Sequence, residues 1–282
     1  MYKILHKTPL NPTVTEMWVE APLVAHKAKP GQFIILRVDE DGERIPLTIA
    51  GVNEEEGAVR IIFQIVGATT YKLNLKQSGD SIADFVGPLG TPSKLDGLHK
   101  VCVVGGGVGC AIALPVAEEL RRLGAGVTSI IGFRNKDLLI LEDAFRSASD
   151  RLIVTTDDGS YGRHGNVTEP LKELLEKERF DEVIAIGPLI MMKFVVAACK
   201  PFGVPVTVSM NPIMIDGTGM CGGCRLTLIQ DDKRVMKFAC VDGPDFNGYE
   251  VDFDEAMRRN RMYGNAERKA YEAACNLLKG GK

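Results

Sequence analysis

The sequence has little of what marks several large classes of protein. Its 282 residues carry a formal net charge of only −3, so its charge balance gives no general attraction to nucleic acid or to an anionic membrane. The first residues lack the apolar core of a signal peptide, and the most apolar stretch, 183–199, is interrupted by Gly187, Pro188 and Lys193. We therefore expect a cytoplasmic protein whose partners include neither nucleic acid nor a membrane.

Histidine is also scarce. The four histidines, His6, His26, His99 and His164, lie far apart in the sequence and are interpreted as surface or packing residues. No arrangement typical of acid–base or nucleophilic catalysis is evident, so we expect no side chain to act as a catalytic acid or base.

What is present is the composition of an ordinary globular protein, with 45% hydrophobic and 25% charged residues. At roughly 100–200 residues per domain, the length predicts two domains and a smaller lobe. Residues 1–96 show no long helical period, and their apolar patterns predict strands at 13–20, 32–38 and 58–66. This region is therefore expected to form an antiparallel β-barrel.

Two motifs within the barrel region are typical of anion sites. Residues 44–48, Arg-Ile-Pro-Leu-Thr, place a guanidinium four residues before a hydroxyl, with a proline stiffening the extended chain between them. Residues 66–70, Val-Gly-Ala-Thr-Thr, offer a glycine turn, backbone N–H groups and hydroxyls at an expected helix start. The alternative is common turn and cap chemistry, with a salt-bridged arginine and a capped short helix.

The pattern then changes to that of a parallel-sheet α/β domain, predicted for residues 97–207. A buried strand and a glycine turn over 101–109, followed by a helix at 110–123, begin a βαβ unit whose helix N-terminus can hold a pyrophosphate. Within that helix, Pro115 fits only near the first turn. Further strands are predicted at 127–132, 152–156 and 182–186, and further helices at 137–147, 167–178 and 189–199.

The glycine turn departs from the usual dinucleotide fingerprint in two ways. Cys110 occupies the place of the third glycine, and Arg134 rather than an acidic residue follows the second strand. An arginine there can contact a 2′-phosphate or a surface carboxylate, so NAD and NADP both stay open. Two further loops, at 157–162 and at 187–188, are expected in the crevice of the same sheet and favour nucleotide binding over a plain scaffold.

Three of the seven cysteines lie in or near one glycine-rich loop. The order Asp216-x4-Cys221-x2-Cys224, with Cys240 after fifteen intervening residues, follows the plant-type ferredoxin pattern with aspartate in place of the first cysteine. This order predicts a [2Fe–2S] cluster in a lobe spanning 208–245. Clustered thiols of this kind are typical of a reducing compartment.

Other uses of these residues stay open on the pattern alone. Zinc accepts the same thiolates, with Cys275 or His164 as a fourth ligand, and three buried thiols can also bind nothing. Asp216 can instead cap a helix. The order of the ligands, together with the nucleotide motifs upstream, favours iron–sulfur over zinc.

Taken in order, these motifs resemble the ferredoxin–NADP reductase superfamily over residues 1–245. The succession of barrel, nucleotide domain and cluster is similar to two families within it. One is the electron-transfer subunit of dihydroorotate dehydrogenase, with four cysteines in its loop. The other is the small subunit of NADH-dependent reduced ferredoxin:NADP oxidoreductase, also described as sulfide dehydrogenase beta subunit, with one aspartate and three cysteines. Asp216 therefore favours the second family.

The resemblance implies FAD, NAD(H) and a [2Fe–2S] cluster as cofactors. FAD would contact Arg44 at its pyrophosphate, Pro46, Leu47 and Thr48 along the isoalloxazine, and Val66, Gly67, Thr69 and Thr70 around phosphate. NAD would contact Gly107, Val108, Gly109 and Gly187, with Asp157 and Asp158 near its ribose or nicotinamide. The cluster ligands would be Asp216, Cys221, Cys224 and Cys240.

The resemblance also implies a role. Hydride would pass between NAD(H) and FAD, and the cluster would exchange single electrons with a larger flavin and iron–sulfur subunit, in a heterodimer or larger complex that reaches ferredoxin by electron bifurcation. The alternatives are the electron-transfer subunit of an NAD-dependent dihydroorotate dehydrogenase and, in another class, a nucleotide-binding sensor with a structural zinc lobe. The tail, 246–282, is expected to be helical and to pack on its own subunit or on the partner.

Overall fold

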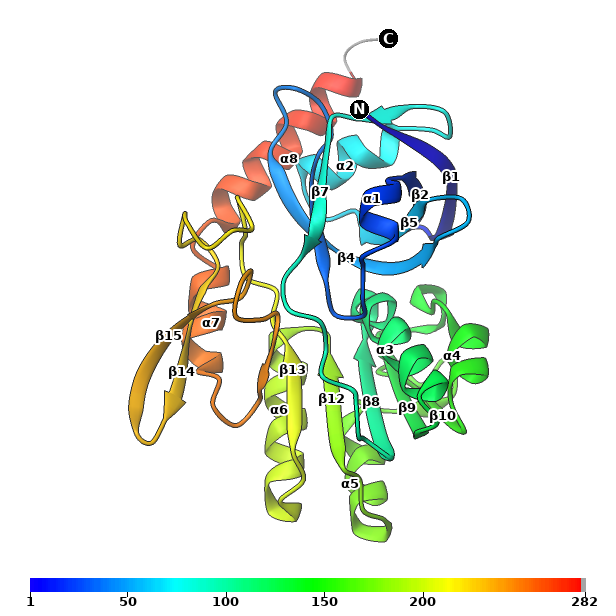
Figure 1. The fold of residues 1–282 in the computed structure, drawn as a ribbon, viewed down its shortest axis with the longest axis vertical. Helices are drawn as coiled ribbons and strands as arrows, with labels where there is room; N and C mark the ends of the chain where they lie inside the picture. Colours follow the sequence, from blue (N-terminus) through cyan, green and yellow to red (C-terminus); the bar gives the residue numbers. More distant parts are fainter. Residues whose placement is uncertain (280–282) are drawn as a thin grey trace.

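A computed structural model describes residues 1–279 of the chain, with side chains as far as residue 273 (Figure 1). It contains an antiparallel barrel sheet, a mostly parallel sheet with helices on both faces, and a two-stranded lobe followed by two helices. None of the helices within the described residues combines the length and the apolar composition needed to cross a membrane. The mixed β and α/β architecture predicted from the sequence is confirmed.

The barrel contains seven strands and two short helices. They are β1 (Tyr2–Asn11), β2 (Val14–Glu20), α1 (Pro22–Ala25), β3 (Phe33–Arg37), β4 (Arg44–Asn53), β5 (Ala58–Gln64), α2 (Ala68–Leu75), β6 (Ser81–Ile82) and β7 (Asp84–Leu89). The sheet order is β6-β1-β2-β5-β4-β3-β7. The two edge strands are separated in the chain by Ala83 alone, so the sheet curls round until its edges nearly meet.

Strand β3 is buried on both faces. Ile34 and Leu36 lie in the barrel core, whereas Phe33 and Ile35 belong to the core that includes the nucleotide sheet and the cysteine lobe. A barrel strand with one face in water would alternate apolar and polar residues. The unbroken apolar run over 33–36 therefore marks the place where the rest of the molecule packs on the barrel.

The second sheet has the order β11-β10-β9-β8-β12-β13-β16, and all its strands are parallel except β16. Its elements are β8 (Lys100–Gly106), η1 (Gly107–Gly109), α3 (Cys110–Arg122), β9 (Gly126–Phe133), η2 (Lys136–Leu138), α4 (Glu142–Ala148), β10 (Arg151–Thr156), β11 (Arg163–His164), α5 (Thr168–Lys177), β12 (Glu182–Ile186), α6 (Leu189–Cys199), η3 (Lys200–Phe202), β13 (Val206–Ser209) and β16 (Asp245–Asn247).

The central strand β8 shows how helices cover both faces of this sheet. Val101 and Val103 pack in the core that holds α3 and α4, whereas Cys102 and Val104 pack in the core that holds α5 and α6. Because successive side chains of a strand point to opposite faces, a strand covered on both sides reads as a continuous apolar run. This is the run that predicted a buried parallel strand.

Two expectations about helices are wrong in detail. Pro115 lies in the second turn of α3 rather than the first, and burial of the surrounding face against the sheet keeps the helix continuous. The helix expected at 137–147 is split, because Leu141 adopts a left-handed conformation with φ of 61° and only α4 continues beyond it.

The remaining elements are the hairpin of β14 (Arg225–Gln230) and β15 (Lys233–Phe238), then α7 (Phe253–Asn260) and α8 (Gly264–Lys279). Lys193 of α6 pairs with Asp254 at 2.6 Å, which ties α7 to the nucleotide sheet. Helix α8 runs back across α2 of the barrel (Figure 1), where the rings of Tyr71 and Tyr271 meet edge to face at 5.8 Å between centroids. The described part of the tail therefore packs on its own chain.

Candidate flavin, nucleotide and iron–sulfur sites

The nucleotide sheet has its topological switch point between β8 and β12. From β8 the chain moves outward to β9 and β10, and then returns to place β12 on the other side of β8. The crevice outside the carboxyl ends of strands at such a point is the usual place for a nucleotide. The glycine loops at 105–109 and 187–188 follow these two strands, so the structure brings them together there.

These two loops are in backbone contact. A Cβ on Gly109 would lie 2.6 Å from the carbonyl oxygen of Ile186 and 2.7 Å from the Cα of Gly187, so only glycine permits this approach. Gly107 has a φ of +55° and open space around it. No side chain caps the turn that holds Val108 or the helix that follows. The Cys110 N–H donates to the carbonyls of Gly107 and Val108, and the other N–H groups of the turn have no side-chain cap, which is typical of a helix start that binds an anion.

Cys110, in the place of the third glycine, is compatible with this geometry. The third glycine of the fingerprint allows close packing of helix on strand. Here Gly105 on the strand supplies that space, because a Cβ added to it would lie 2.9 Å from the sulfur of Cys110. The departure in sequence is therefore not a departure in packing.

Asp157 and Asp158 lie at the carboxyl end of β10, two strands away from β8 at the same edge of the sheet. The Asp158 carboxylate accepts hydrogen bonds from the hydroxyl of Ser160 at 2.6 Å and from its N–H at 2.9 Å, and these bonds lower the pKa of Asp158. The N–H of Asp158 donates to the carbonyl of Arg134 at 3.2 Å. Both aspartates thus lie on the β9 side of the crevice, away from Gly187.

The flavin motif of the barrel lies on β4, where residues 46–48 stand opposite residues 33–35 of β3 and are half-buried. Arg44 begins the strand with an exposed side chain, and its Nε donates to the carbonyl oxygen of Ile215 at 3.1 Å. Ile215 directly precedes Asp216 in the cysteine loop. One guanidinium therefore links the predicted flavin site to the predicted cluster site.

The second barrel motif forms the start of α2, as expected. The Thr70 hydroxyl accepts the N–H groups of Val66 and Gly67 at 3.0 Å each, and the Thr69 hydroxyl donates to a carboxylate oxygen of Glu43 at 3.1 Å. Gly67 itself is extended and carries no cap. The turn is thus closed by Thr70, and the N-cap residue Gly67 offers no side-chain cap to the first helical turn.

The cysteine loop is shaped by glycines in the left-handed region, Gly217 at φ +78°, Gly219 at +83° and Gly222 at +67°. A Cβ on Gly217 would lie 2.6 Å from the Cδ1 atom of Leu89 and 2.8 Å from that of Ile35. Both contacts are barrel side chains. The loop can therefore rest directly on the barrel only because residue 217 has no side chain.

The loop and the β15 end bring thiols and N–H groups together. The sulfurs of Cys224 and Cys240 are buried and 3.1 Å apart, far longer than a disulfide. The N–H of Gly223 donates to the sulfur of Cys221 at 3.4 Å, and the N–H of Gly219 donates to that of Cys240. Burial, with the Cys224 sulfur alongside, raises the pKa of Cys240 to about 12.

Asp216 does not cap a helix, because its carboxylate is held by backbone amides of its own loop. Its carboxylate accepts the N–H of Thr218 at 2.8 Å and the N–H of Cys221 at 2.7 Å, and these bonds keep the pKa of Asp216 below its ordinary value. This arrangement fixes a negative charge beside the first cysteine of the loop. Its role as an iron ligand stays a prediction.

The donor set fits a two-iron cluster better than a single zinc ion. The donors lie in two pairs, with the sulfurs of Cys224 and Cys240 3.1 Å apart and the Asp216 carboxylate bonded to the N–H of Cys221, whereas structural zinc takes four ligands around one ion. His164 lies on β11, at the opposite edge of the nucleotide sheet from β16, and the side chain of Cys275 is outside the described residues. The paired thiols, with N–H groups aimed at sulfur, match the surroundings of an iron–sulfur cluster.

Several residues that assemble these sites have no signature in the sequence. Ile215 offers only its backbone carbonyl to Arg44, and Leu89 and Ile35 act only through contact with Gly217. Backbone acceptors and packing partners have no residue-type signature. The nearest signals in the sequence are the basic residue of the barrel motif and the glycines of the cysteine loop.

Comparison with known proteins places the chain in a family. Residues 211–252 match the family model described as the iron–sulfur cluster binding domain of dihydroorotate dehydrogenase B. A Thermotoga maritima protein described as dihydroorotate dehydrogenase B (NAD(+)), electron transfer subunit homolog, is 47% identical over 96% of this chain and 94% of its own length. The electron transfer subunit of Streptococcus pneumoniae is 33% identical over 86% of this chain and 97% of its own length.

Solved structures agree with this grouping. A chain of the NADH-dependent reduced ferredoxin-NADP oxidoreductase, studied for flavin-based electron bifurcation, superposes with a TM-score of 0.90 at 46% identity and covers 97% of each chain. The ferredoxin reductase of carbazole 1,9a-dioxygenase, 17% identical, has the same fold over 73% of this chain and 67% of its own, with a TM-score of 0.62. This chain belongs to the family of dihydroorotate dehydrogenase B electron transfer subunits and their homologues, which are oxidoreductase subunits built on the ferredoxin–NADP reductase fold.

Proposed function

We propose that this chain is an electron-transfer subunit that binds FAD, NAD(H) and a [2Fe–2S] cluster. It exchanges hydride with NAD(H) and single electrons with a larger flavin and iron–sulfur subunit. When bound, the flavin supplies the conversion between two-electron and one-electron chemistry, and the cluster supplies one-electron transfer. The protein's own residues hold these carriers in position.

One observation carries this proposal: the hydrogen bond of 3.1 Å between Arg44 Nε and the carbonyl of Ile215. It brings the strand with the flavin motif against the loop with the cysteines. The close contact of Gly217 with Leu89 and Ile35 supports the same juxtaposition. Two redox carriers in one chain can exchange electrons only if they are close, and these contacts provide for that.

The proposed residue roles follow the geometry. Arg44 binds the FAD pyrophosphate, residues 46–48 line the isoalloxazine, and residues 66–70 bind phosphate through the first turn of α2. Gly107, Val108, Gly109 and Gly187 bind the NAD pyrophosphate, with Asp157 and Asp158 on the ribose side of the crevice. Asp216, Cys221, Cys224 and Cys240 ligate the cluster.

The proposed partner is the larger subunit of an electron-bifurcating complex that oxidises NADPH and reduces ferredoxin and NAD. The 46% identity with the bifurcating structure over 97% of both chains supports this partner, as does Asp216 in the ligand set. The alternative, a dihydroorotate-oxidising partner, is supported by the match of residues 211–252 and by the names of the curated relatives. Clustered thiols support a reducing cytoplasmic location.

Anaerobic purification of the chain with its partner tests the proposal. We expect flavin absorption bands, a reducible [2Fe–2S] signal in electron paramagnetic resonance (EPR) spectra, and flavin reduction by NADH. Absence of both flavin and a reducible cluster would favour the sensor with a zinc lobe. A co-purifying subunit that oxidises dihydroorotate would select the alternative partner.

Cys224→Ser separates the cluster from the flavin. Because the Cys224 sulfur is buried against that of Cys240, its loss removes one of two paired ligands without touching the barrel. We expect the EPR signal to disappear while FAD stays bound at the wild-type ratio. Cys199→Ser, which changes a buried thiol on α6, serves as the control and should keep both cofactors.

A further inference from the structure

Two arginines from different elements donate to adjacent carbonyl groups of the cysteine loop. Arg225 Nη1, at the start of β14, donates to the carbonyl oxygen of Gly222 at 3.1 Å. Arg259 Nη2, from α7 in the tail, donates to the carbonyl oxygen of Gly223 at 3.4 Å. These two glycines are the residues between Cys221 and Cys224 in the proposed cluster loop.

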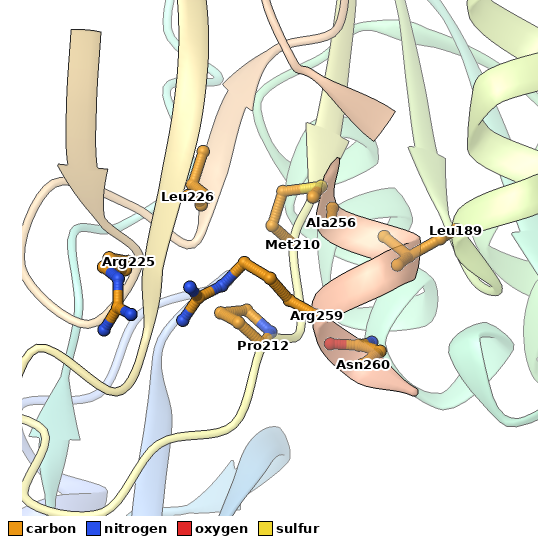
Figure 2. A pocket seen from close by; sticks show the side chains of 8 residues that line it. All are labelled: Leu189, Met210, Pro212, Arg225, Leu226, Ala256, Arg259 and Asn260. Carbon is orange, nitrogen blue, oxygen red and sulfur yellow. The ribbon is translucent and has the colours of Figure 1, made fainter. Parts of the chain in front are cut away.

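Figure 2 shows how the second arginine reaches the loop. Arg259 extends from α7 past Pro212 toward the strand that carries Arg225 and Leu226. It is half-buried, in a small pocket whose other walls include Leu189, Met210 and Ala256. These apolar walls lie along the methylene stem of Arg259, and the guanidinium at its end meets the loop carbonyl.

The planarity of the peptide bond gives these contacts a consequence. In a trans peptide the C=O of one residue and the N–H of the next point in opposite directions. Arg225 holds the Gly222 carbonyl through its Nη1 at 3.1 Å and its backbone N–H at 3.4 Å, so the N–H of Gly223 turns the other way and meets the Cys221 sulfur at 3.4 Å. With the Gly223 carbonyl held by Arg259, the N–H of Cys224 likewise points away from that guanidinium.

We propose that Arg225 and Arg259 are positioning residues for the [2Fe–2S] cluster, which they orient through the Gly222–Gly223 turn. They fix the direction of two peptide N–H groups, of which that of Gly223 meets the Cys221 sulfur, and they place two positive charges beside the loop. Both effects stabilise the cluster after it gains an electron, because the added negative charge is opposed by N–H dipoles and by guanidinium groups. This inference rests on the proposed cluster site.

The test is a redox titration of the cluster, followed by EPR, in the holoprotein and in single variants. For Arg225→Gln and for Arg259→Gln, we expect the equilibrium constant for reduction to fall about tenfold, a lowering of the midpoint by ~59 mV for one electron. Arg258→Gln is the matched control. It removes the same charge from an exposed neighbour on α7 that does not contact the loop in the described structure. Its midpoint should move by less than a third as much.

Arg259→Lys separates the two effects, because it keeps the positive charge but loses the planar fork that binds the carbonyl. A midpoint between those of wild type and Arg259→Gln supports both roles. Poor cluster incorporation in Arg259→Gln, with FAD retained and the Arg258→Gln control normal, also supports the proposal. Full incorporation with unchanged midpoints in both arginine-to-glutamine variants overturns it, as does loss of FAD together with the cluster. A wild-type protein without any cluster signal would instead overturn the proposed function.

Discussion

The contact between Gly109 and the β12–α6 loop makes a specific prediction about nucleotide binding. In Gly109→Ala, the new methyl group would lie 2.6 Å from the Ile186 carbonyl oxygen and 2.7 Å from the Gly187 Cα. Both are backbone atoms, so no side-chain rotation can relieve the clash. The loops must separate, and overpacking of this kind costs ~1–3 kcal/mol.

This separation widens the crevice at the carboxyl ends of β8 and β12, where we place the NAD pyrophosphate. Losing ~1.4 kcal/mol of binding energy corresponds to a tenfold weaker affinity. We therefore expect the Kd for NADH, measured by calorimetry, to rise at least about tenfold in Gly109→Ala. The FAD content and the cluster signal should stay at wild-type levels, because the residues proposed for those sites lie on β4, at the start of α2 and in the cysteine loop.

Gly264→Ala is the matched control. A Cβ at Gly264 meets no atom within 4 Å and its backbone is not in the left-handed region. The same substitution in a helix replaces a residue of low helix propensity with the best one, so stability should hold or rise by up to ~1 kcal/mol. If Gly109→Ala bound NADH as tightly as the wild type and melted at the same temperature, the close packing of these loops, and the pyrophosphate site built on it, would be refuted.

Three further substitutions test other parts of the molecule. Arg44→Gln removes the charge-assisted bond expected to hold the FAD pyrophosphate, a loss of ~1.5–3 kcal/mol, so FAD should be bound roughly 10–100-fold more weakly in fluorescence titrations. Asp216→Ala leaves the N–H groups of Thr218 and Cys221 without their acceptor, so cluster content measured by iron analysis should fall while FAD is retained. Asp245→Asn tests a buried carboxyl. Its Oδ1 has no hydrogen-bond partner in the described structure, whereas its Oδ2 accepts the Ser93 hydroxyl at 2.5 Å. Burial raises the pKa of Asp245. Because the pKa of Asp245 is higher in the folded than in the unfolded protein, the wild type loses stability as the pH rises through the folded pKa. The melting temperature of Asp245→Asn should therefore exceed that of the wild type by a margin that grows with pH, and a margin independent of pH would contradict this.

Much of the fold follows from local patterns in the sequence. The run over 101–104 and the glycines after it predicted a buried strand and a helix start, and the structure has β8, η1 and α3 there. These patterns succeed because backbone conformation is limited by nearby residues and because burial on both faces requires apolar side chains. The same reasoning failed at Pro115 and Leu141, where packing against the sheet overrides the local preference.

The cofactor motifs show a similar division. The sequence by itself determined the types and order of the ligand residues, since the spacing Asp216-x4-Cys221-x2-Cys224 is written in the chain. It did not reveal that Gly105 makes room for Cys110, or that the tail returns through α8 to the barrel. Contacts between segments far apart in sequence depend on the whole fold.

Only the tertiary structure decided how the sites relate to one another. The bond from Arg44 to Ile215 and the bond from Arg259 to Gly223 join residues 171 and 36 positions apart, and each uses a backbone carbonyl as acceptor. Every residue carries such a carbonyl, so the sequence contains no mark of which one will be used. The chemistry was determined by residue types, whereas the path between the carriers was determined by packing.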